Sequence, residues 1–537
     1  MDELPKQKKS FFRRELVYLV VVLIAAILVG IIAILRLTTS TPVLRSAGYV
    51  ENLPKEQVRV GGFAEMDRYP LMDFVVESIQ ANANVFEGLT ILRNGRVVPG
   101  LAESWTNPDP LTWKIKLRSG VKFHSGDSLK ASDVKYTIEE AKKNESWVSN
   151  PMASRVEDVS VVNDTTVELK TKEPDPTLLH WLVYVGILSQ EQVKQDGVEN
   201  AAGTGPYRID SFEKDKVVLA ANSNYWAGQP KVKEIAYRQY KDNNALAAAL
   251  EKGEVDIIPL TNKSSNEKLK EEGFQVKPFR LADLNFLGFD ITNNKAKYVE
   301  GPKNPFLDLK VRKAILAALD ISAVIKNSGR AGEPLSQFAV PELIGYNTSL
   351  PKSGRDLTAA KKLLVEAGYA DGFTVTFDVE FLKKPEGEEI KKQLEEAGVK
   401  VKLNVIESID DFYGKLFSGD FSFVLITYGV DTLDSTDLLN SFVHTPTASK
   451  GEANVSNYSN FDLDKLLDEA SITFNLEERT EVMKNAHKKF MEQLPYIPLF
   501  TRLGFCAMKD DIAFKPVPLG YIFGFEISGR QKATETQ

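Results

Sequence analysis

The stretch NVFEGLTILRNGRVVPGLAESWTNPDPLTWKIKLRSGVKFHSGDSLKASDVKYTIEEA, residues 84–141, indicates most directly how this chain folds. Within it, LTWKIKLR (111–118) alternates apolar and polar side chains, a pattern typical of a strand with one buried face. The spacing of apolar residues then becomes helical, with Ser132 or Asp133 placed as the helix cap. A strand followed by an amphipathic helix predicts an α/β layer in which helices cover a sheet.

The same alternation continues along the chain. Strands are predicted at residues 165–171, 216–221 and 255–258, and helices at residues 242–253, 308–327, 358–369 and 386–398. At about 150 residues per domain, the part beyond residue 37 predicts two or three lobes. Residues 199–207, rich in Gly and Ala, and the polar residues 290–305 are the predicted passages between lobes.

A run of acidic residues follows one predicted strand. The apolar run 423–427 breaks at Gly429, and Asp431, Asp434 and Asp437 come next. Ligands of open α/β sheets gather at the carboxyl ends of strands, so Asp431 is a candidate ligand-binding residue. The alternative is a helix cap, for which Asp434 is better placed, with Asp437 completing a capping box. The spacing does not fit a calcium loop, whose ligands alternate around a glycine.

The start of the chain predicts a membrane anchor. Residues 16–35 are uncharged and long enough for one helix to cross a bilayer. Because positive residues cluster before this run, residues 1–15 are predicted as a cytoplasmic tail and 16–36 as a transmembrane anchor. Residues 37–57 would be a linker to a domain outside the cytoplasm, in a single-pass protein of the cell membrane. The alternative is a cleaved signal peptide, with a weak site at residues 46–48.

The charge of the chain argues against nucleic-acid binding. The whole chain carries −7, and its first 36 residues hold six Lys or Arg against three Asp or Glu. The part beyond the anchor is therefore acidic, whereas a nucleic-acid surface is basic.

Residues suited to catalysis or metal binding are scarce. The histidines His124, His180, His444 and His487 are scattered, and Cys506 is the only cysteine. This spacing offers neither a zinc pair nor a disulfide. The chain also lacks a Gly-x-Ser-x-Gly elbow, a phosphate-binding loop and an HExxH motif, so the sequence predicts no enzyme, no cofactor and no metal site.

Seven phrases in a fixed order carry a family resemblance. They are the stretch 84–141, GTGPYRIDSFEKDKVVLAANSNYWAGQPKVKEIAYR (203–238), ALAAALEKGEVDII (245–258), PFLDLKVRKAILAALD (305–320), DLTAAKKLLVEAGYADGF (356–373), SNYSNFDLDKLLDEA (456–470) and EERTEVMKNAHKKFMEQLPYIPLF (477–500). Together they resemble the bacterial extracellular solute-binding proteins of family 5, the peptide- and nickel-type substrate-binding components of ABC importers. The resemblance covers essentially all of residues 58–510.

The resemblance implies a periplasmic-binding-protein-like α/β fold with three lobes, two main lobes plus an inserted one, after the N-terminal transmembrane helix. Lobe one would comprise residues 58–83, 203–290 and 499–530. Lobe two would be the insertion 84–202, and lobe three residues 291–498. The ligand would lie between lobes one and three, which close on it by a hinge motion.

The resemblance also implies site residues. Peptide binders of the family carry a motif reading roughly Trp-x-x-Asp-Tyr-x-Asp-Pro, whose first Asp pairs with the peptide α-ammonium group. Here Tyr428 stands at the Trp position, Gly429 and Val430 at the small pair, Asp431 at the ammonium-binding position and Asp434 at the second acid. The expected ligand-binding residues are therefore Asp431, Tyr428 and Gly429.

Two further observations bear on the ligand. Residues 70–78 lie where family members place an extended strand beside the ligand, so Phe74 and Val76 are further candidates, with burial in lobe one as the alternative. The motif's Tyr and Pro are replaced by Thr432 and Ser435, a departure that puts peptide specificity in question.

The resulting expectation is a membrane-tethered, monomeric receptor that captures a small-molecule or peptide ligand, foremost a peptide, and delivers it to ABC transporter permease subunits. A nickel chelate, haem or a sugar on the same fold is the alternative ligand. A surface enzyme or scaffold is the alternative from another class.

Topology gives the first test. If residues 16–35 form an uncleaved anchor, the mature protein keeps Met1 or Asp2 at its N-terminus and fractionates with membranes. N-terminal sequencing of the protein from its host checks this. A sequence that starts near Gly48 would show that a signal peptide had been removed.

Overall fold

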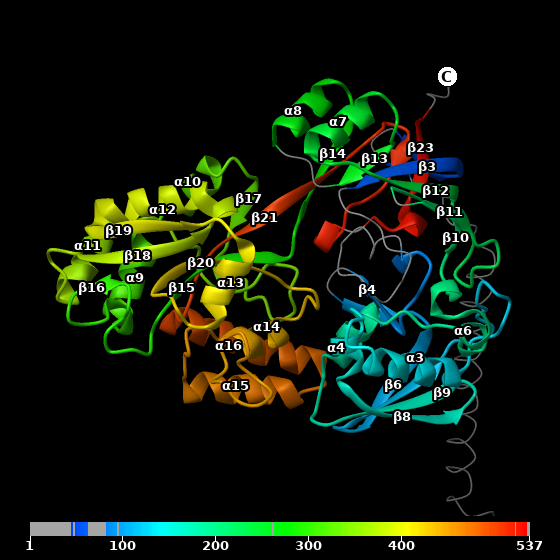
Figure 1. The fold of residues 1–537 in the computed structure, drawn as a ribbon, viewed down its shortest axis with the longest axis horizontal. Helices are drawn as coiled ribbons and strands as arrows, with labels where there is room; N and C mark the ends of the chain where they lie inside the picture. Colours follow the sequence, from blue (N-terminus) through cyan, green and yellow to red (C-terminus); the bar gives the residue numbers. More distant parts are fainter. Residues whose placement is uncertain are drawn as a thin grey trace, which may run out of the picture.

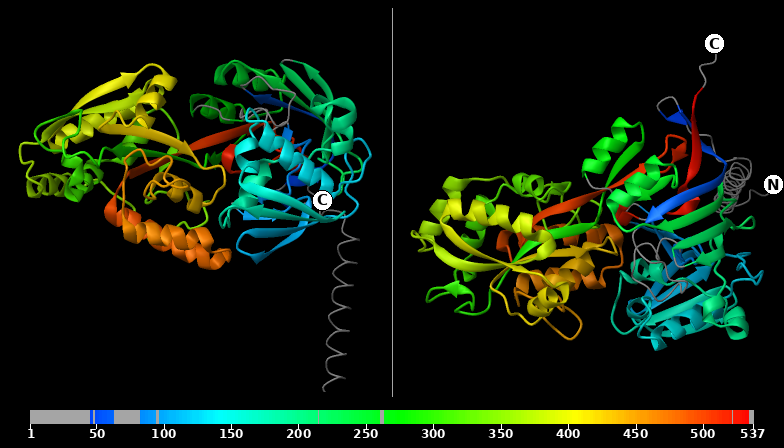
Figure 2. Two further views of the ribbon diagram at one scale, coloured as in Figure 1. Left: turned by 60° about the horizontal axis from the view of Figure 1, so that its bottom comes forward. Right: turned by 45° about the horizontal axis from the view of Figure 1, so that its top comes forward.

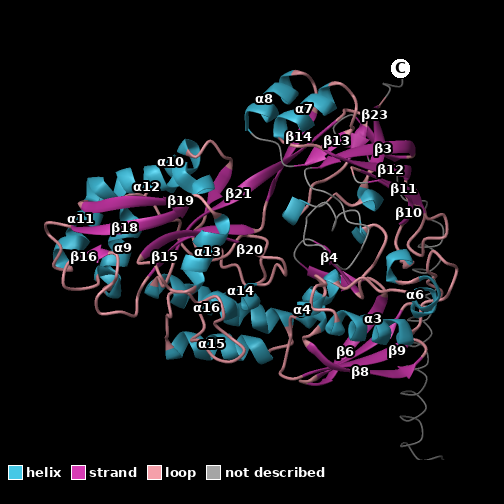
Figure 3. Ribbon diagram, in the orientation of Figure 1, coloured by secondary structure: helices cyan, strands magenta, loops and turns pink. Residues whose placement is uncertain are grey.

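The computed structural model describes residues 45–46, 49–62, 82–93, 96–213, 215–259, 263–520 and 522–533. It shows a mixed α/β protein with one large sheet and a smaller, helix-covered sheet beside it (Figures 1 and 3). The α/β class predicted from the sequence is confirmed. The predicted tail and anchor lie outside the described residues, and within the described part no helix is long and apolar enough to cross a membrane.

The first half of the large sheet has the strand order β10-β11-β12-β3-β13 and then reaches β21. Its strands are β10 (Tyr207–Glu213), β11 (Lys216–Ala221), β12 (Val232–Gln239), β3 (Lys55–Gly62), β13 (Ile257–Pro259) and, on β21, β14 (Gln275–Arg280). Helices α7 (Asn243–Glu251) and α8 (Lys263–Glu271) pack on it through buried Leu246, Leu250 and Leu269. The two ends of the described chain meet in a separate sheet of β1 (Arg45–Ser46), β2 (Tyr49–Leu53), β23 (Ser528–Lys532) and β22 (Ile512–Ala513).

The second half of the large sheet is covered by helices on both faces. Its strands are β15 (Asp283–Phe289), β20 (Phe423–Gly429), β18 (Phe373–Glu380), β19 (Val399–Ile406), β16 (Val299–Glu300) and β17 (Gly332–Pro334). One face carries α9 (Leu309–Ala318), α10 (Ile321–Asn327), α11 (Leu357–Glu366) and α12 (Lys384–Ala397). The other carries α13 (Ile409–Phe417), α14 (Ser435–Phe442), α15 (Phe461–Ile472) and α16 (Leu476–Gln493).

The side chains of the central strands explain why helices cover both faces of this half of the sheet. On β20, Phe423 and Leu425 point into one core, whereas Val424 and Ile426 point into the other. Because successive side chains of a strand face opposite sides, an apolar run without polar alternation must be buried on both faces. The run 423–427 that looked interior in the sequence is such a strand.

The small-sheet region comprises residues 84–202. Its sheet has the order β6-β7-β9-β8, built from β6 (Ala102–Asp109), β7 (Thr112–Leu117), β9 (Thr166–Thr171) and β8 (Val156–Asn163). The hairpin of β4 (Thr90–Arg93) and β5 (Arg96–Pro99) precedes it, and the helices are α3 (Ala131–Lys143), α4 (Asn150–Ala153), α5 (Leu178–Trp181) and α6 (Gln190–Asp196).

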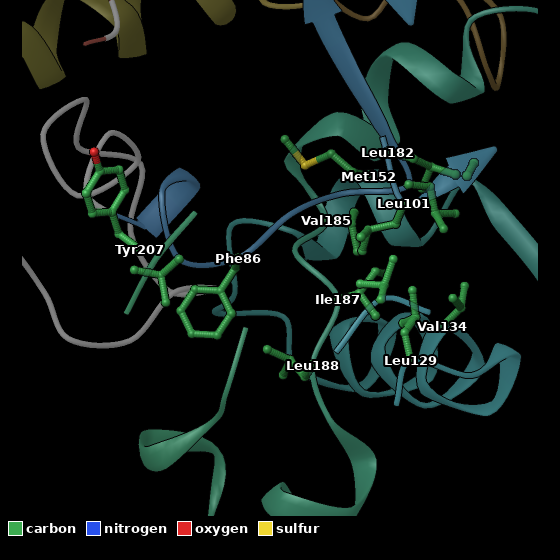
Figure 4. Packing of buried hydrophobic residues seen from close by; sticks show 14 of the residues in the cluster. Phe86, Leu101, Leu129, Val134, Met152, Leu182, Val185, Ile187, Leu188 and Tyr207 are labelled. Atoms are coloured by element: carbon green, nitrogen blue, oxygen red, sulfur yellow. The ribbon is translucent and has the colours of Figure 1, made fainter. Parts of the chain in front are cut away.

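The small-sheet region shares one apolar core with the first half of the large sheet. In Figure 4, Leu101, Val134 and Ile187 pack together, and Phe86 continues the cluster toward Tyr207 at the start of β10. The second half of the large sheet has two cores of its own. The division into three lobes at the boundaries expected from the sequence remains a prediction.

One long strand joins the two halves of the large sheet. β21 (Ile497–Met508) pairs with β15 near Phe500 and with β14 from Leu503 to Met508, so it runs from one half into the other. Figures 1 and 2 show it crossing between the two parts of the molecule.

Most local predictions agree with the structure, but the single helix predicted over 308–327 is divided into α9 and α10, and the predicted cap of α3 is wrong. The predicted strand 111–118 is β7, and the helix predicted over 386–398 is α12, followed directly by β19. The cap of α3 was placed wrongly at Ser132 or Asp133, because the helix begins at Ala131 after Lys130. Asp133 is the third helical residue, and from there its carboxylate accepts the N–H of Lys130 at 2.8 Å. The acid satisfies the helix start from within the first turn.

Gly398 supplies a test of the fold. It ends α12 with φ of 105°, a backbone conformation that costs a residue with Cβ about 1–2 kcal/mol. Gly398→Ala should therefore lower the free energy of unfolding by about that amount. Gly414→Ala, inside α13 with open space around its Cα, is the control, and it should leave stability unchanged or raise it by up to ~1 kcal/mol. Urea unfolding of both variants measures the difference, and equal effects would contradict the assignment.

Candidate functional site

A cavity of about 660 Å3 lies where the three parts of the molecule meet. Residues in or just before the small-sheet region contribute from the segments 82–93 and 183–186, and residues 515–518, 523, 525 and 526 contribute from the end of the chain. Glu342 and Leu433 reach it from the second half of the large sheet. Its size is that of a site for a small ligand or short peptide.

The wall of the cavity combines aromatic side chains with a few charges. Phe86, Tyr184, Phe523 and Phe525 supply apolar surface. The charged residues on the wall are Glu87, Arg93, Glu342, Lys515 and Glu526. Burial raises the pKa of Glu526, and the nearby Arg93 opposes that shift. Such a surface can hold an apolar ligand body and orient its polar ends.

Glu87 is engaged by the protein itself. Its carboxylate accepts hydrogen bonds from Tyr225 Oη at 2.6 Å, Trp226 Nε1 at 3.0 Å and Thr204 Oγ1 at 2.8 Å. Burial raises the pKa of Glu87, and these three donors partly offset the rise. We assign Glu87 to joining the small-sheet region to the first half of the sheet, because its carboxylate is already occupied by these donors.

Asp431 lies two residues beyond the end of β20 and two residues before Leu433, which lines the cavity. Its neighbour Val430 is buried, whereas its own side chain is exposed. The backbone carbonyl of Asp431 accepts a hydrogen bond at 2.8 Å from Tyr184 Oη, and Tyr184 lines the cavity. Partial withdrawal from water raises the pKa of Asp431. Its carboxylate makes no ion pair or hydrogen bond with any residue of the described ranges.

The turn after Asp431 has an uncommon backbone. Leu433 adopts φ of 53° and lines the cavity, although its side chain is almost fully buried. The Ile344 N–H donates to the Leu433 carbonyl at 3.0 Å and helps to hold the turn. A left-handed backbone at a leucine persists only where its surroundings enforce it, and such positions are frequent at functional sites.

The predicted site residues Tyr428, Gly429 and Asp431 lie at or just after the end of β20, and none of them is among the residues that line the cavity. Gly429 is the last residue of β20, and Tyr428 is 37% exposed, with its ring edge-on to Phe442 at 4.6 Å between centroids. Burial and the nearby Asp431 raise the pKa of Tyr428 to about 12. Phe74 and Val76 lie outside the described residues.

Asp434 has the structural role predicted for it. It caps α14 by accepting the Thr436 N–H at 2.9 Å. Its other carboxylate oxygen accepts from Arg479 at 3.0 Å, in an ion pair that is almost completely buried. Burial tends to raise the pKa of Asp434, but Arg479, His180 and hydrogen bonding from Thr436 together hold the pKa below the usual range.

Asp437 was predicted to complete a capping box with Asp434, and this is wrong. Its Oδ1 instead lies 3.0 Å from Thr177 Oγ1 in the small-sheet region. The contact spans 260 positions of sequence, so no local pattern announces it.

Sequence reasoning missed most of the cavity wall. The apolar, proline-rich stretch 515–526 near the end of the chain was the available signal, but its composition does not separate a cavity wall from ordinary core. In the described part of the chain, no three His, Cys, Asp or Glu side chains gather as a metal site requires.

The fold and the cavity define a class, that of substrate-capturing α/β binding proteins. The model of the bacterial extracellular solute-binding proteins, family 5 (middle region), matches residues 96–450, and the chain belongs to this family. The family resemblance drawn from the sequence is thereby confirmed.

Named relatives extend the comparison. Haem-binding protein A of Haemophilus influenzae is 25% identical over 501 residues, covering 85% of this chain and 90% of that protein. The glutathione-binding protein GsiB of Pectobacterium atrosepticum is 26% identical over 485 residues, covering 86% and 91%. The solved structure of the ABC transporter-associated periplasmic binding protein DppA from Helicobacter pylori, in complex with the peptide STSA, has a TM-score of 0.68 at 23% identity, covering 89% and 98%.

The buried pair of Asp434 and Arg479 supplies a stability test. Arg479→Met should leave the Asp434 charge buried without its partner, which costs about 3–5 kcal/mol of unfolding free energy. Lys489→Met, which breaks an exposed pair with Asp462 at 3.0 Å, is the control and should cost less than about 1 kcal/mol. Urea unfolding at pH 7 compares the two. The hypothesis fails if the Arg479 variant is as stable as the control.

The same pair predicts a pH dependence. The folded pKa of Asp434 is depressed, so its stabilising contribution is present above the unfolded pKa of about 4 and is lost as pH falls through the folded pKa. The difference in unfolding free energy between wild type and Arg479→Met should therefore decrease as the pH falls below about 4.

Proposed function

We propose that this chain captures a peptide in the cavity between its lobes and delivers it to the permease of an ABC importer. The observation that carries the proposal is the exposed Asp431 carboxylate, which stands beside the cavity without a cationic partner in the described chain. The α-ammonium group of a peptide would supply the missing charge.

The surroundings of Asp431 favour an ammonium partner. Water around the carboxylate is partly displaced by protein, and a charge pair is stronger where water is scarce. The Tyr184 hydroxyl holds the Asp431 backbone from across the cavity edge. A ligand amine at this carboxylate would place the ligand body against the aromatic wall of Phe86, Phe523 and Phe525.

Closure of the cavity would follow the proposed lobe division. Lobe one would comprise residues 58–83, 203–290 and 499–530, lobe two residues 84–202, and lobe three residues 291–498. Among the described residues, β21 carries the strand ladder from one half of the sheet into the other, and the short link from β14 to β15 crosses beside it. A small change in their twist would move lobe three toward the other lobes, as in hinge closure around ligands.

A haem-like ligand is the second candidate. It is favoured by the aromatic wall of the cavity and by the similarity to a protein whose name records haem binding. The replaced motif positions do not decide between the ligands, because Thr432 and Ser435 are both buried and do not form the exposed surface at Asp431. We expect no catalytic turnover with either ligand.

Tethering by the predicted helix at residues 16–36 is part of the proposal. It would keep the receptor beside its permease at the outer face of the membrane.

Asp431→Asn tests the site. The change keeps the side-chain shape and removes the charge, so the peptide ammonium is left poorly compensated. Affinity should fall by about 30-fold to several thousand-fold, equivalent to about 2–5 kcal/mol. Isothermal titration of the purified full-length protein with a peptide pool, and then with single peptides, measures the change.

Two controls accompany the titration. Asp410→Asn is the same substitution at an exposed position on α13 and should bind as wild type does. N-acetylated peptides should bind wild type as weakly as free peptides bind Asp431→Asn. Equal binding of free and acetylated peptides by wild type and Asp431→Asn would refute the role of Asp431. Binding of haem with no peptide binding would replace the peptide proposal.

A further inference from the structure

The small-sheet region and the second half of the sheet also touch each other away from the place where β21 crosses between the halves. In Figure 1, α14 and α4 lie below that crossing. The contacts here are Thr177 with Asp437, Tyr184 with Asp431, Glu173 with Ser449 at 3.2 Å, and the rings of Trp113 and Phe474 with centroids 5.5 Å apart. A contact far from a hinge forms or breaks when the hinge moves.

The centre of this contact is a group of four polar side chains. Arg155 Nε donates to Asp175 Oδ2 at 2.8 Å, and both belong to the small-sheet region. A second Arg155 nitrogen donates to Thr177 Oγ1 at 3.2 Å and lies 3.7 Å from Asp437 Oδ1. Asp437 is the member of the group that comes from the opposite side.

Asp437 has fewer hydrogen-bond donors in this group than Asp175, whose two carboxylate oxygens accept the Thr177 backbone N–H at 3.0 Å and Arg155 Nε at 2.8 Å. Thr177 Oγ1 lies 2.9 Å from Asp175 Oδ1 and 3.0 Å from Asp437 Oδ1, but a hydroxyl has one proton to donate. The other oxygen of Asp437, Oδ2, is buried without a hydrogen-bond partner among the described residues. If Asp437 carries a proton, Thr177 can donate to Asp175 and accept from both Arg155 and Asp437, and its hydroxyl is then fully satisfied.

The surroundings of Asp437 also favour its protonated form. Burial raises the pKa of Asp437 to about 7, with Asp175 and Asp434 adding to the rise and Arg155 opposing it. Other charged or titratable groups near this contact are His180 on α5, Arg479 on α16, Tyr428 on β20, Asp431, Glu452 and Glu173. Arg479 is already paired with Asp434, and burial lowers the pKa of His180, which leaves Arg155 as the cation facing Asp437.

We propose that Asp437, Thr177 and Arg155 form a latch between lobes two and three, and that the latch binds one proton as it closes. The proposal rests on the proposed function, since closure of these lobes encloses the ligand cavity. Tyr184 connects the two sites, because it lines the cavity and its hydroxyl holds the Asp431 carbonyl across the same contact.

The sign of the effect follows from the two states of Asp437. When the lobes separate, Asp437 is solvated and its pKa returns to about 4. The pKa in the closed state is higher, so the proton stabilises closure fully below about pH 4 and is lost as pH rises through about 7. Between these values, the closing equilibrium constant should fall by up to about tenfold per pH unit.

Distance measurements without ligand test the latch. Spin labels are placed at Glu157→Cys on β8 and Lys465→Cys on α15, two exposed positions on opposite sides of the contact, while Cys506 is buried and unreactive. Double electron–electron resonance on the full-length protein then measures the distance between the two labels at pH 5.5 and at pH 8.0. We expect the short-distance fraction of wild type to be several-fold larger at pH 5.5.

Asp437→Asn in the labelled protein should keep the short distance at both pH values, because its neutral amide can donate to Thr177 without titrating. Asp410→Asn is the matched control and should retain the wild-type pH response. A wild type that does not respond to pH, or an Asp437→Asn variant that responds as wild type does, would overturn the proposal.

Thr177→Val gives an independent reading should the Asp437 variant fail to fold, which circular dichroism would reveal. It removes the hydroxyl that Asp437 contacts, so the short-distance fraction at pH 5.5 should fall severalfold. An unchanged fraction would overturn the latch. These measurements use no ligand, so a failure of peptide titration would count against the proposed function and leave the latch to be judged by the distances.

Discussion

The architecture depends on one strand that belongs to both halves of the large sheet. β21 pairs with β14 at one end and with β15 at the other, so within the described chain this strand carries the ladder from one half into the other. The crossing is fastened by an ion pair between Arg502 and Asp283, and by the Arg502 N–H, which donates to Asp283 at 2.9 Å. Because the ladder fixes direction but not twist, it can hold the halves together and still let them move.

The groups that hold the cavity wall in place belong to one or the other of the two parts that β21 joins. Glu87, held by Tyr225, Trp226 and Thr204, joins the small-sheet region to the first half of the sheet and makes them one unit. On the other side, the buried pair of Asp434 and Arg479 anchors the start of α14. The turn containing Asp431 therefore lies between β20 and the anchored start of α14, and the Asp431 side chain is exposed.

The sequence predicted what depends on neighbours along the chain and missed what depends on topology. The double-faced run at 423–427, the end of α12 at Gly398 and the cap at Asp434 follow from local spacing, and each is found in the structure. The partners Arg479 and Thr177 stand 45 and 260 positions from Asp434 and Asp437, so their contacts could not be read from a pattern. The predicted cap of α3 is wrong because a carboxylate can accept the same backbone N–H either from the capping position or from the third helical residue. The spacing of residues in the sequence does not distinguish these two positions.

The three carboxylates that follow β20, those of Asp431, Asp434 and Asp437, lie in three different environments. Asp434 is buried with a full cationic partner and is held ionised. Asp431 is exposed, and its carboxylate has no ion-pair partner among the described residues, which is why we propose it as the site for a ligand charge. Asp437 shares the distant cation Arg155 with Asp175, which already holds that cation at 2.8 Å, so a proton is the remaining way to neutralise it in the closed contact. Three residues of one type, each three positions apart, thus differ in role because the cations near them are unequally shared.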